Sequence, residues 1–125
     1  MRRSESGTAA LEFALVVPLL LVLTLGVVQV GLIVRDDLVL AGAARAGARE
    51  AAVTSDDGRV RAAIDRSAPG LEAGSIDVSV ARSGRGSPAS VSLIYHERVR
   101  VPFVDWLFPA AITLRAQAAM RQEFG

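Results

Sequence analysis

The chain has 125 residues, of which 14 are basic and 13 acidic, so its formal net charge at pH 7 is +1. This balance argues against a strongly basic surface, and we expect no nucleic-acid partner. The absence of cysteine excludes disulfides, thiolate nucleophiles and zinc–thiolate sites.

An uncharged run from Phe13 to Val34 follows a short basic leader and a single carboxylate at Glu12. As a helix these 22 residues extend about 33 Å at the usual rise per residue, enough to cross a hydrocarbon core of ~30 Å. A cleaved signal peptide is the alternative, but its apolar core is only ~7 to 15 residues long. The sequence therefore predicts one membrane-spanning helix. Pro18 should kink it, and Gln29 is either a contact between helices or an amide that lipid tolerates.

The helical pattern continues past the charges at residues 35–37, so we expect one continuous helix from about Ala9 to Val53. Small residues recur every four positions in its last part, which would let another backbone approach closely. The partner would be another protein or the domain's own sheet; a simple run of good helix formers is the alternative. The small residues are Ala43, Gly47 and Ala51, and Ala44, Ala48 and Ala52.

The remainder of the chain predicts a short helix and three strands, and hence an α+β fold. A break at residues 55–58 precedes a helix from Arg59 to Ser67. Three runs near residues 76–80, 91–101 and 112–120 then alternate apolar and polar residues, as strands of an antiparallel sheet with one buried face do. A glycine-rich turn, residues 82–88, joins the first two runs. Glu97 breaks the apolar side of the second run, which a bulge or an edge position would explain.

The connection from Pro102 to Pro109 is unusually apolar for a loop. Its large side chains are Phe103, Trp106, Leu107 and Phe108. We expect them to cap the open end of the core, in which case Trp106→Ala should destabilise the domain by ~3 to 5 kcal/mol. The alternative is a surface patch that docks a partner or anchors at the membrane interface.

The sequence offers no catalytic set. His96 is the sole histidine and alternates outward on a predicted strand. The neighbouring acids at 36–37 and 56–57 suit a helix border and a turn, and no serine lies in a G-x-S-x-G motif. We expect no enzymatic activity, no cofactor and no metal.

Three segments carry a family resemblance: GTAALEFALVVPLLL from Gly7, AARAGAREAA, and ITLRAQAAMRQE near the C-terminus. They resemble the TadE-like family of pseudopilins, and the N-terminus resembles that of type IV prepilins. The resemblance implies a pilin-like fold and cleavage after Gly7 by a prepilin peptidase, with Thr8 as the new N-terminus. Glu12 and Phe13 would then serve peptidase recognition and assembly. The Glu12 carboxylate would pair with the Thr8 amine of an adjacent subunit.

The resemblance also implies the organisation and role of the chain. Residues 1–7 would be a leader peptide, 8–34 the transmembrane helix, 35–54 its extracytoplasmic extension, and 55–125 a small α+β domain. The implied role is a minor pilin or pseudopilin in assembly of a tight-adherence (Flp-type) pilus or a related secretion apparatus. The alternative is an unprocessed, membrane-anchored extracytoplasmic binding module.

The implied partners are the prepilin peptidase, other pilins and pseudopilins, the inner-membrane assembly platform and membrane lipid. Basic residues on both sides of the span leave its orientation open. The resemblance implies a cytoplasmic N-terminus in the bacterial inner membrane, with the domain outside it or incorporated in a surface pilus.

Overall fold

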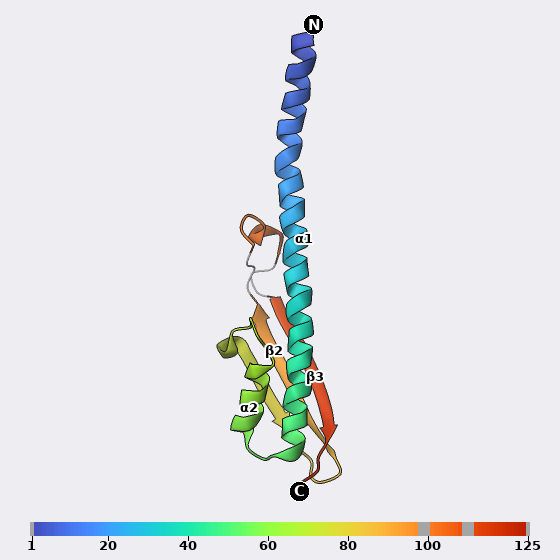
Figure 1. The fold of residues 1–125 in the computed structure, drawn as a ribbon, viewed down its shortest axis with the longest axis vertical. Helices are drawn as coiled ribbons and strands as arrows, with labels where there is room; N and C mark the ends of the chain where they lie inside the picture. The colour runs from blue at the N-terminus through green and yellow to red at the C-terminus, as the bar shows by residue number, and fades with distance from the viewer. Residues whose placement is uncertain (1, 98–100, 109–111, 125) are drawn as a thin grey trace.

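The computed structural model of the chain describes residues 2–97, 101–108 and 112–124. Its elements are α1 (Arg2–Val53), α2 (Asp57–Arg66), η1 (Ala73–Ser75), β1 (Ile76–Ala81), β2 (Pro88–Glu97), η2 (Asp105–Leu107) and β3 (Ile112–Arg121). The N-terminal half of α1 projects as a rod, and its C-terminal half packs against the sheet and α2 (Figure 1). The fold is α+β, as the sequence predicts.

Helix α1 is uninterrupted over 52 residues, which corresponds to about 78 Å. The prediction of a continuous helix across the charges at residues 35–37 is confirmed, and the helix also continues through Pro18. The predicted start near Ala9 is wrong, because the helix already begins at Arg2. Glu5 lies in this first turn, where a carboxylate stabilises the positive end of the helix dipole.

The small residues of α1 pack against the chain's own domain. Those with no exposed surface include Ala43, Ala44, Ala48 and Ala51. A Cβ on Gly47 would lie 2.7 Å from Ile64 Cγ1 of α2 and 3.3 Å from Val91 Cγ1 of β2. The Ile64 side chain therefore occupies the space that a side chain at position 47 would need. The small face of α1 thus packs against α2 and the sheet of its own domain.

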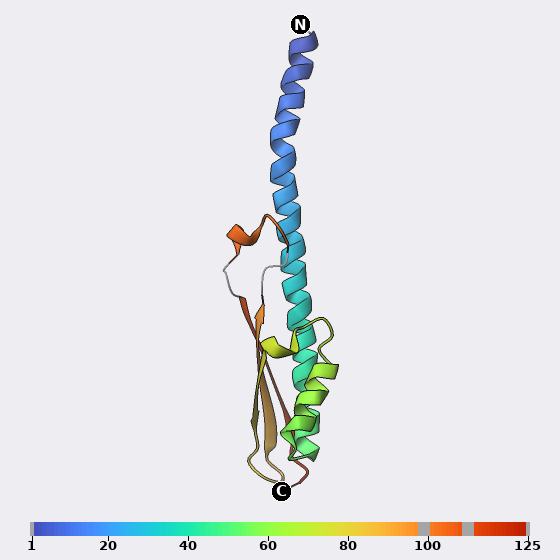
Figure 2. The same cartoon turned by 90° about the vertical axis from the view of Figure 1, so that its left-hand side faces the viewer.

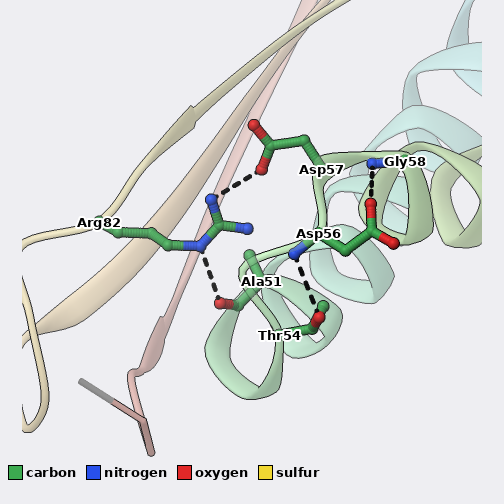
Figure 3. Close-up of polar contacts among 6 residues, drawn as sticks. All are labelled: Ala51, Thr54, Asp56, Asp57, Gly58 and Arg82. Atoms are coloured by element: carbon green, nitrogen blue, oxygen red, sulfur yellow. Dashed lines mark hydrogen bonds and ion pairs between the residues drawn. The ribbon is translucent and has the colours of Figure 1, made fainter.

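Helix α2 begins two residues before its predicted start because Asp56 caps it. The Asp56 carboxylate accepts a hydrogen bond from Gly58 N at 2.9 Å. Arg82 then connects three elements (Figure 3). Its Nη1 donates to Asp57 Oδ1 at 2.7 Å, and its Nε donates to the Ala51 carbonyl oxygen at 3.3 Å. The start of α2 and the end of α1 are thereby joined to the segment that follows β1.

The three predicted strands form one antiparallel sheet in the order β1-β2-β3. Pairing runs from Ile76↔Tyr95 to Ala81↔Ser90 between β1 and β2, and from Pro88↔Arg121 to Glu97↔Ile112 between β2 and β3. In the second view the sheet is seen nearly edge-on beside α1 and α2 (Figure 2). The face toward the helices is apolar, with fully or almost fully buried β2 side chains at Val91 and Leu93.

The second strand differs from its predicted range at both ends. It begins at Pro88 and ends at Glu97; residues 98–100, which were predicted to continue it, lie outside the described residues. Glu97 is only 2% exposed and keeps regular pairing with Ile112, so the suggested bulge is wrong. Because β1 begins opposite Tyr95, Glu97 extends past that strand. At Glu97, β2 therefore lies beyond the pairing with β1 and forms an edge of the sheet within the described residues, which is the other explanation suggested by the sequence.

Candidate functional site

The N-terminal half of α1 is an exposed apolar surface. The segment is long and apolar enough to cross a membrane, and only 6% of its most apolar window is buried within the chain. A core helix of a soluble protein would be mostly buried. The same helix continues into the core of the sheet domain, where Leu40 has no exposed surface. It is therefore a candidate membrane span that is part of the folded chain, as expected of a membrane-anchored protein.

The residues of the predicted cleavage and assembly site lie on the first turns of α1. Glu5, Thr8, Ala9 and Glu12 line one shallow pocket on the same helix face, as their spacing of three and four requires. The adjacent Phe13 is 69% exposed. The Glu12 carboxylate, the proposed new N-terminal residue Thr8 and the exposed Phe13 ring thus lie within about two turns of α1.

Gly7 has no packing role among the described residues. A Cβ at this position would meet nothing within 4 Å. Its bond to Thr8 lies inside α1, where glycine lowers helix stability by about 1 kcal/mol relative to alanine. The local effect of Gly7 is therefore to make the helix easier to open at the predicted cleavage site.

The apolar loop lies beside α1, away from the part of the sheet that α1 and α2 cover (Figures 1 and 2). Phe103 and Trp106 are 74% and 70% exposed, whereas Val101 and Val104 are buried. The predicted cap is wrong, because the Phe103 and Trp106 side chains face outward. The small face of α1 and helix α2 already cover the core, with Ile64 among the side chains that have no exposed surface.

Gln29 joins this loop to α1. Its side chain is fully buried, and its Oε1 accepts a hydrogen bond from Val101 N at 3.1 Å. The sequence singled out Gln29 as the one amide in the uncharged run but gave no sign of its partner, which lies 72 positions later. The partner of Gln29 in the structure is thus the loop of the same chain, and not a second helix.

Leu107 and Phe108 of the loop form an apolar groove with α1. The helix side of the groove is lined by Val22, Leu23, Gly26, Val27 and Val30. All five lie inside the run predicted to cross the membrane. The loop and the candidate span thus form one apolar surface.

The polar residues considered for catalysis lie beside individual charged partners. His96 is exposed, and its Nε2 lies 3.2 Å from Asp77 Oδ2 on the sheet face away from the helices. Asp36 is fully buried beside the Arg35 guanidinium, at 3.1 Å. Within residues 2–97, 101–108 and 112–124, no three histidine, aspartate or glutamate side chains come together as a metal site.

Comparison with known proteins adds a family match to this geometry. The model of the TadE-like protein family matches residues 7–49. The match begins at Gly7, includes Glu12 and Phe13, and ends within α1, so it confirms the resemblance in the N-terminal part of the chain. No curated protein and no solved structure matched the chain.

Proposed function

We propose that this TadE-like protein is a minor pilin or pseudopilin that is processed by a prepilin peptidase. The processed protein then acts in assembly of a tight-adherence (Flp-type) pilus or a related secretion apparatus. The observation that carries the proposal is α1: one helix holds the Gly7–Thr8 bond, the exposed apolar run and the core face of the sheet domain. The family match over residues 7–49 covers most of that helix.

Processing would change the chemistry at the start of the span. Loss of residues 1–7 leaves a free amine on Thr8, and Glu12 lies on the same face of α1. A carboxylate at the head of an apolar helix is unfavourable in lipid unless it reaches water or is paired. An amine from an adjacent processed subunit would supply that partner, so Glu12 would favour assembly of processed chains only.

The intact mass of the protein from its native host tests the processing. We expect loss of residues 1–7 and an N-terminal sequence that begins at Thr8. Gly7→Val should leave the leader attached, whereas Gly31→Val should be processed normally. Gly31 is a matched control because a Cβ there also meets nothing within 4 Å. A full-length wild-type chain in cells with an active peptidase would support the unprocessed binding module instead.

The role of Glu12 is tested separately, by crosslinking to other pilins in membranes. Glu12→Ala should insert normally, since it removes a charge from an apolar segment, but should crosslink less because the neighbouring amine loses its counter-charge. Glu5→Ala is the control: Glu5 lines the same pocket but belongs to the leader and leaves with it. Undiminished crosslinking of the processed Glu12→Ala protein would limit Glu12 to peptidase recognition.

The proposal places the N-terminus in the cytoplasm and the sheet domain outside the inner membrane, in contact with other pilins and the assembly platform. The chain has no cysteine, so a single introduced thiol can report on sidedness. Ser79→Cys on the exposed face of β1 should react with an impermeant maleimide in intact spheroplasts. Labelling only after lysis would indicate the opposite orientation, with the sheet domain in the cytoplasm.

A further inference from the structure

We propose that the aromatic loop, residues 101–108, enters the bilayer leaflet nearest the sheet domain and attaches that domain to the membrane a second time. The ligand is lipid: the acyl chains and headgroup boundary beside α1. The inference rests on α1 as the membrane span of the proposed function, and not on cleavage or on a pilus role.

The level of the loop along α1 is the first argument. The uncharged run ends at Val34, and Leu107 and Phe108 contact α1 between Val22 and Val30. At the helical rise per residue, these contacts lie about 6 to 18 Å inside the end of the run. Half of a hydrocarbon core is about 15 Å thick. The part of the groove from Gly26 to Val30, about 6 to 12 Å inside the end of the run, therefore falls within the nearer leaflet, and Val22 and Leu23 lie close to the bilayer midplane.

Keeping the loop in water would leave the span too short. The bilayer boundary would then have to lie N-terminal to the contacts, near Val22. Only the ten residues from Phe13 to Val22 would remain as uncharged span, about 15 Å of helix against a core of ~30 Å. If the helix is tilted, these ten residues span even less of the core. The length of the apolar run thus favours a loop within the membrane over one above it.

The surface of the loop suits lipid. Phe103, Trp106 and Leu107 are 74%, 70% and 48% exposed, an unfavourable arrangement in water and a typical one at a membrane interface. Asp105 is the one charged residue among positions 101–108 and is exposed. Its carboxylate must reach the headgroup layer, so the Asp105 side chain points towards the boundary, and Leu107 and Phe108 line the groove beside α1.

Several polar groups of the loop have partners within the chain. Gln29 accepts the hydrogen bond of Val101 N at 3.1 Å, and Trp106 Nε1 donates to the Phe103 carbonyl oxygen at 2.8 Å. Leu107 N donates to the Val104 carbonyl oxygen at 2.9 Å. Non-helical backbone at membrane depth is tolerated where it is buried in protein. These bonds satisfy part of the loop within the chain, and the remaining polar groups must reach water at the headgroup boundary.

The backbone at Phe103 points to a role for its side chain. Phe103 has φ = 67°, in the left-handed region that glycine adopts without strain. Its exposed ring makes no contribution to the core that would offset this strain. A phenylalanine with an exposed ring at this backbone conformation is consistent with a contact outside the chain.

The fluorescence of Trp106, the sole tryptophan, tests the proposal in the full chain. The protein is reconstituted in phosphatidylcholine–phosphatidylglycerol vesicles with or without phosphatidylcholine brominated on shallow acyl carbons. We expect blue-shifted emission, a large loss of emission in brominated vesicles and little quenching by aqueous iodide. Phe103→Gly relieves the backbone strain and should keep the fold, yet it should weaken the quenching by brominated lipid.

Two control variants carry Trp106→Phe and a tryptophan elsewhere. Val28→Trp, on the exposed side of α1, should be quenched by brominated lipid, and Gln117→Trp, exposed on β3, should be quenched by iodide. Quenching at position 28 with an iodide-accessible Trp106 would overturn the loop insertion while leaving the span intact. Absence of quenching at position 28 would overturn the span and the inference with it. A blue shift that depends on protein density, without quenching by brominated lipid, would identify a second copy of the chain as the partner and overturn the lipid proposal.

Discussion

Replacement of Gly47 by alanine tests whether close helix packing holds the sheet domain on α1. The new Cβ would lie 2.7 Å from Ile64 Cγ1, 2.9 Å from Ile64 Cδ1 and 3.3 Å from Val91 Cγ1. The first two distances are shorter than carbon atoms tolerate, and Ile64 has no exposed surface into which it could move. Gly47→Ala must therefore displace α2 or force Ile64 from its rotamer.

The magnitude follows from two opposing effects. Alanine stabilises a helix interior by about 1 kcal/mol over glycine, and insertion of a methyl group into a packed core destabilises it by roughly 1 to 3 kcal/mol. Gly42→Ala in the same helix has the first effect only, since its Cβ would meet nothing closer than Arg45 Nη2 at 4.0 Å. The difference between the two variants should therefore be roughly 1 to 3 kcal/mol, with Gly47→Ala the less stable.

The free energy of unfolding is measured on the full chain in detergent by pulse proteolysis at increasing urea concentration. In an Ile64→Ala background the same Gly47→Ala change should lose its penalty, because both atoms that it would overlap are absent. That double-mutant cycle should show a coupling energy of roughly 1 to 3 kcal/mol. Equal stability of Gly47→Ala and Gly42→Ala, or a coupling near zero, would refute close packing at this position.

Two further substitutions test individual hydrogen bonds. Gln29→Leu leaves Val101 N without its acceptor, so the free energy needed to open the loop should fall by about 1 to 3 kcal/mol. Hydrogen–deuterium exchange should then accelerate across residues 101–108 and stay unchanged in β2. Arg82→Met should destabilise the domain by about 1 to 3 kcal/mol in the same proteolysis assay, because it removes the donors to Ala51 and Asp57; unchanged stability would mean that water replaces these contacts without loss.

The sheet and the small helix face could be predicted because each follows from a short period in the sequence. Val91 and Leu93 alternate with Ser90 and Ser92, and the burial of β2 has the same period of two. Gly47 lies among alanines four residues apart, and the structure places it directly against the Ile64 side chain of α2. Local patterns of this kind constrain the backbone directly.

The loop could not be predicted, because its position depends on contacts between distant residues and on the surrounding medium. Nothing local joins Gln29 to Val101, and Arg82 lies in a segment typical of a simple glycine-rich turn. The cap hypothesis assumed that Trp106 would avoid water by entering the core. The structure instead leaves Trp106 exposed beside an apolar helix, which is consistent with a different solvent at that level.

The continuity of α1 has a mechanical consequence. No break occurs between the exposed apolar run and Leu40, where the helix enters the core, so no flexible linker separates the two parts. Rotation of the span about its own axis therefore turns the sheet by the same angle. Any neighbour that fixes the azimuth of the helix within the membrane also determines the direction in which the exposed face of the sheet points.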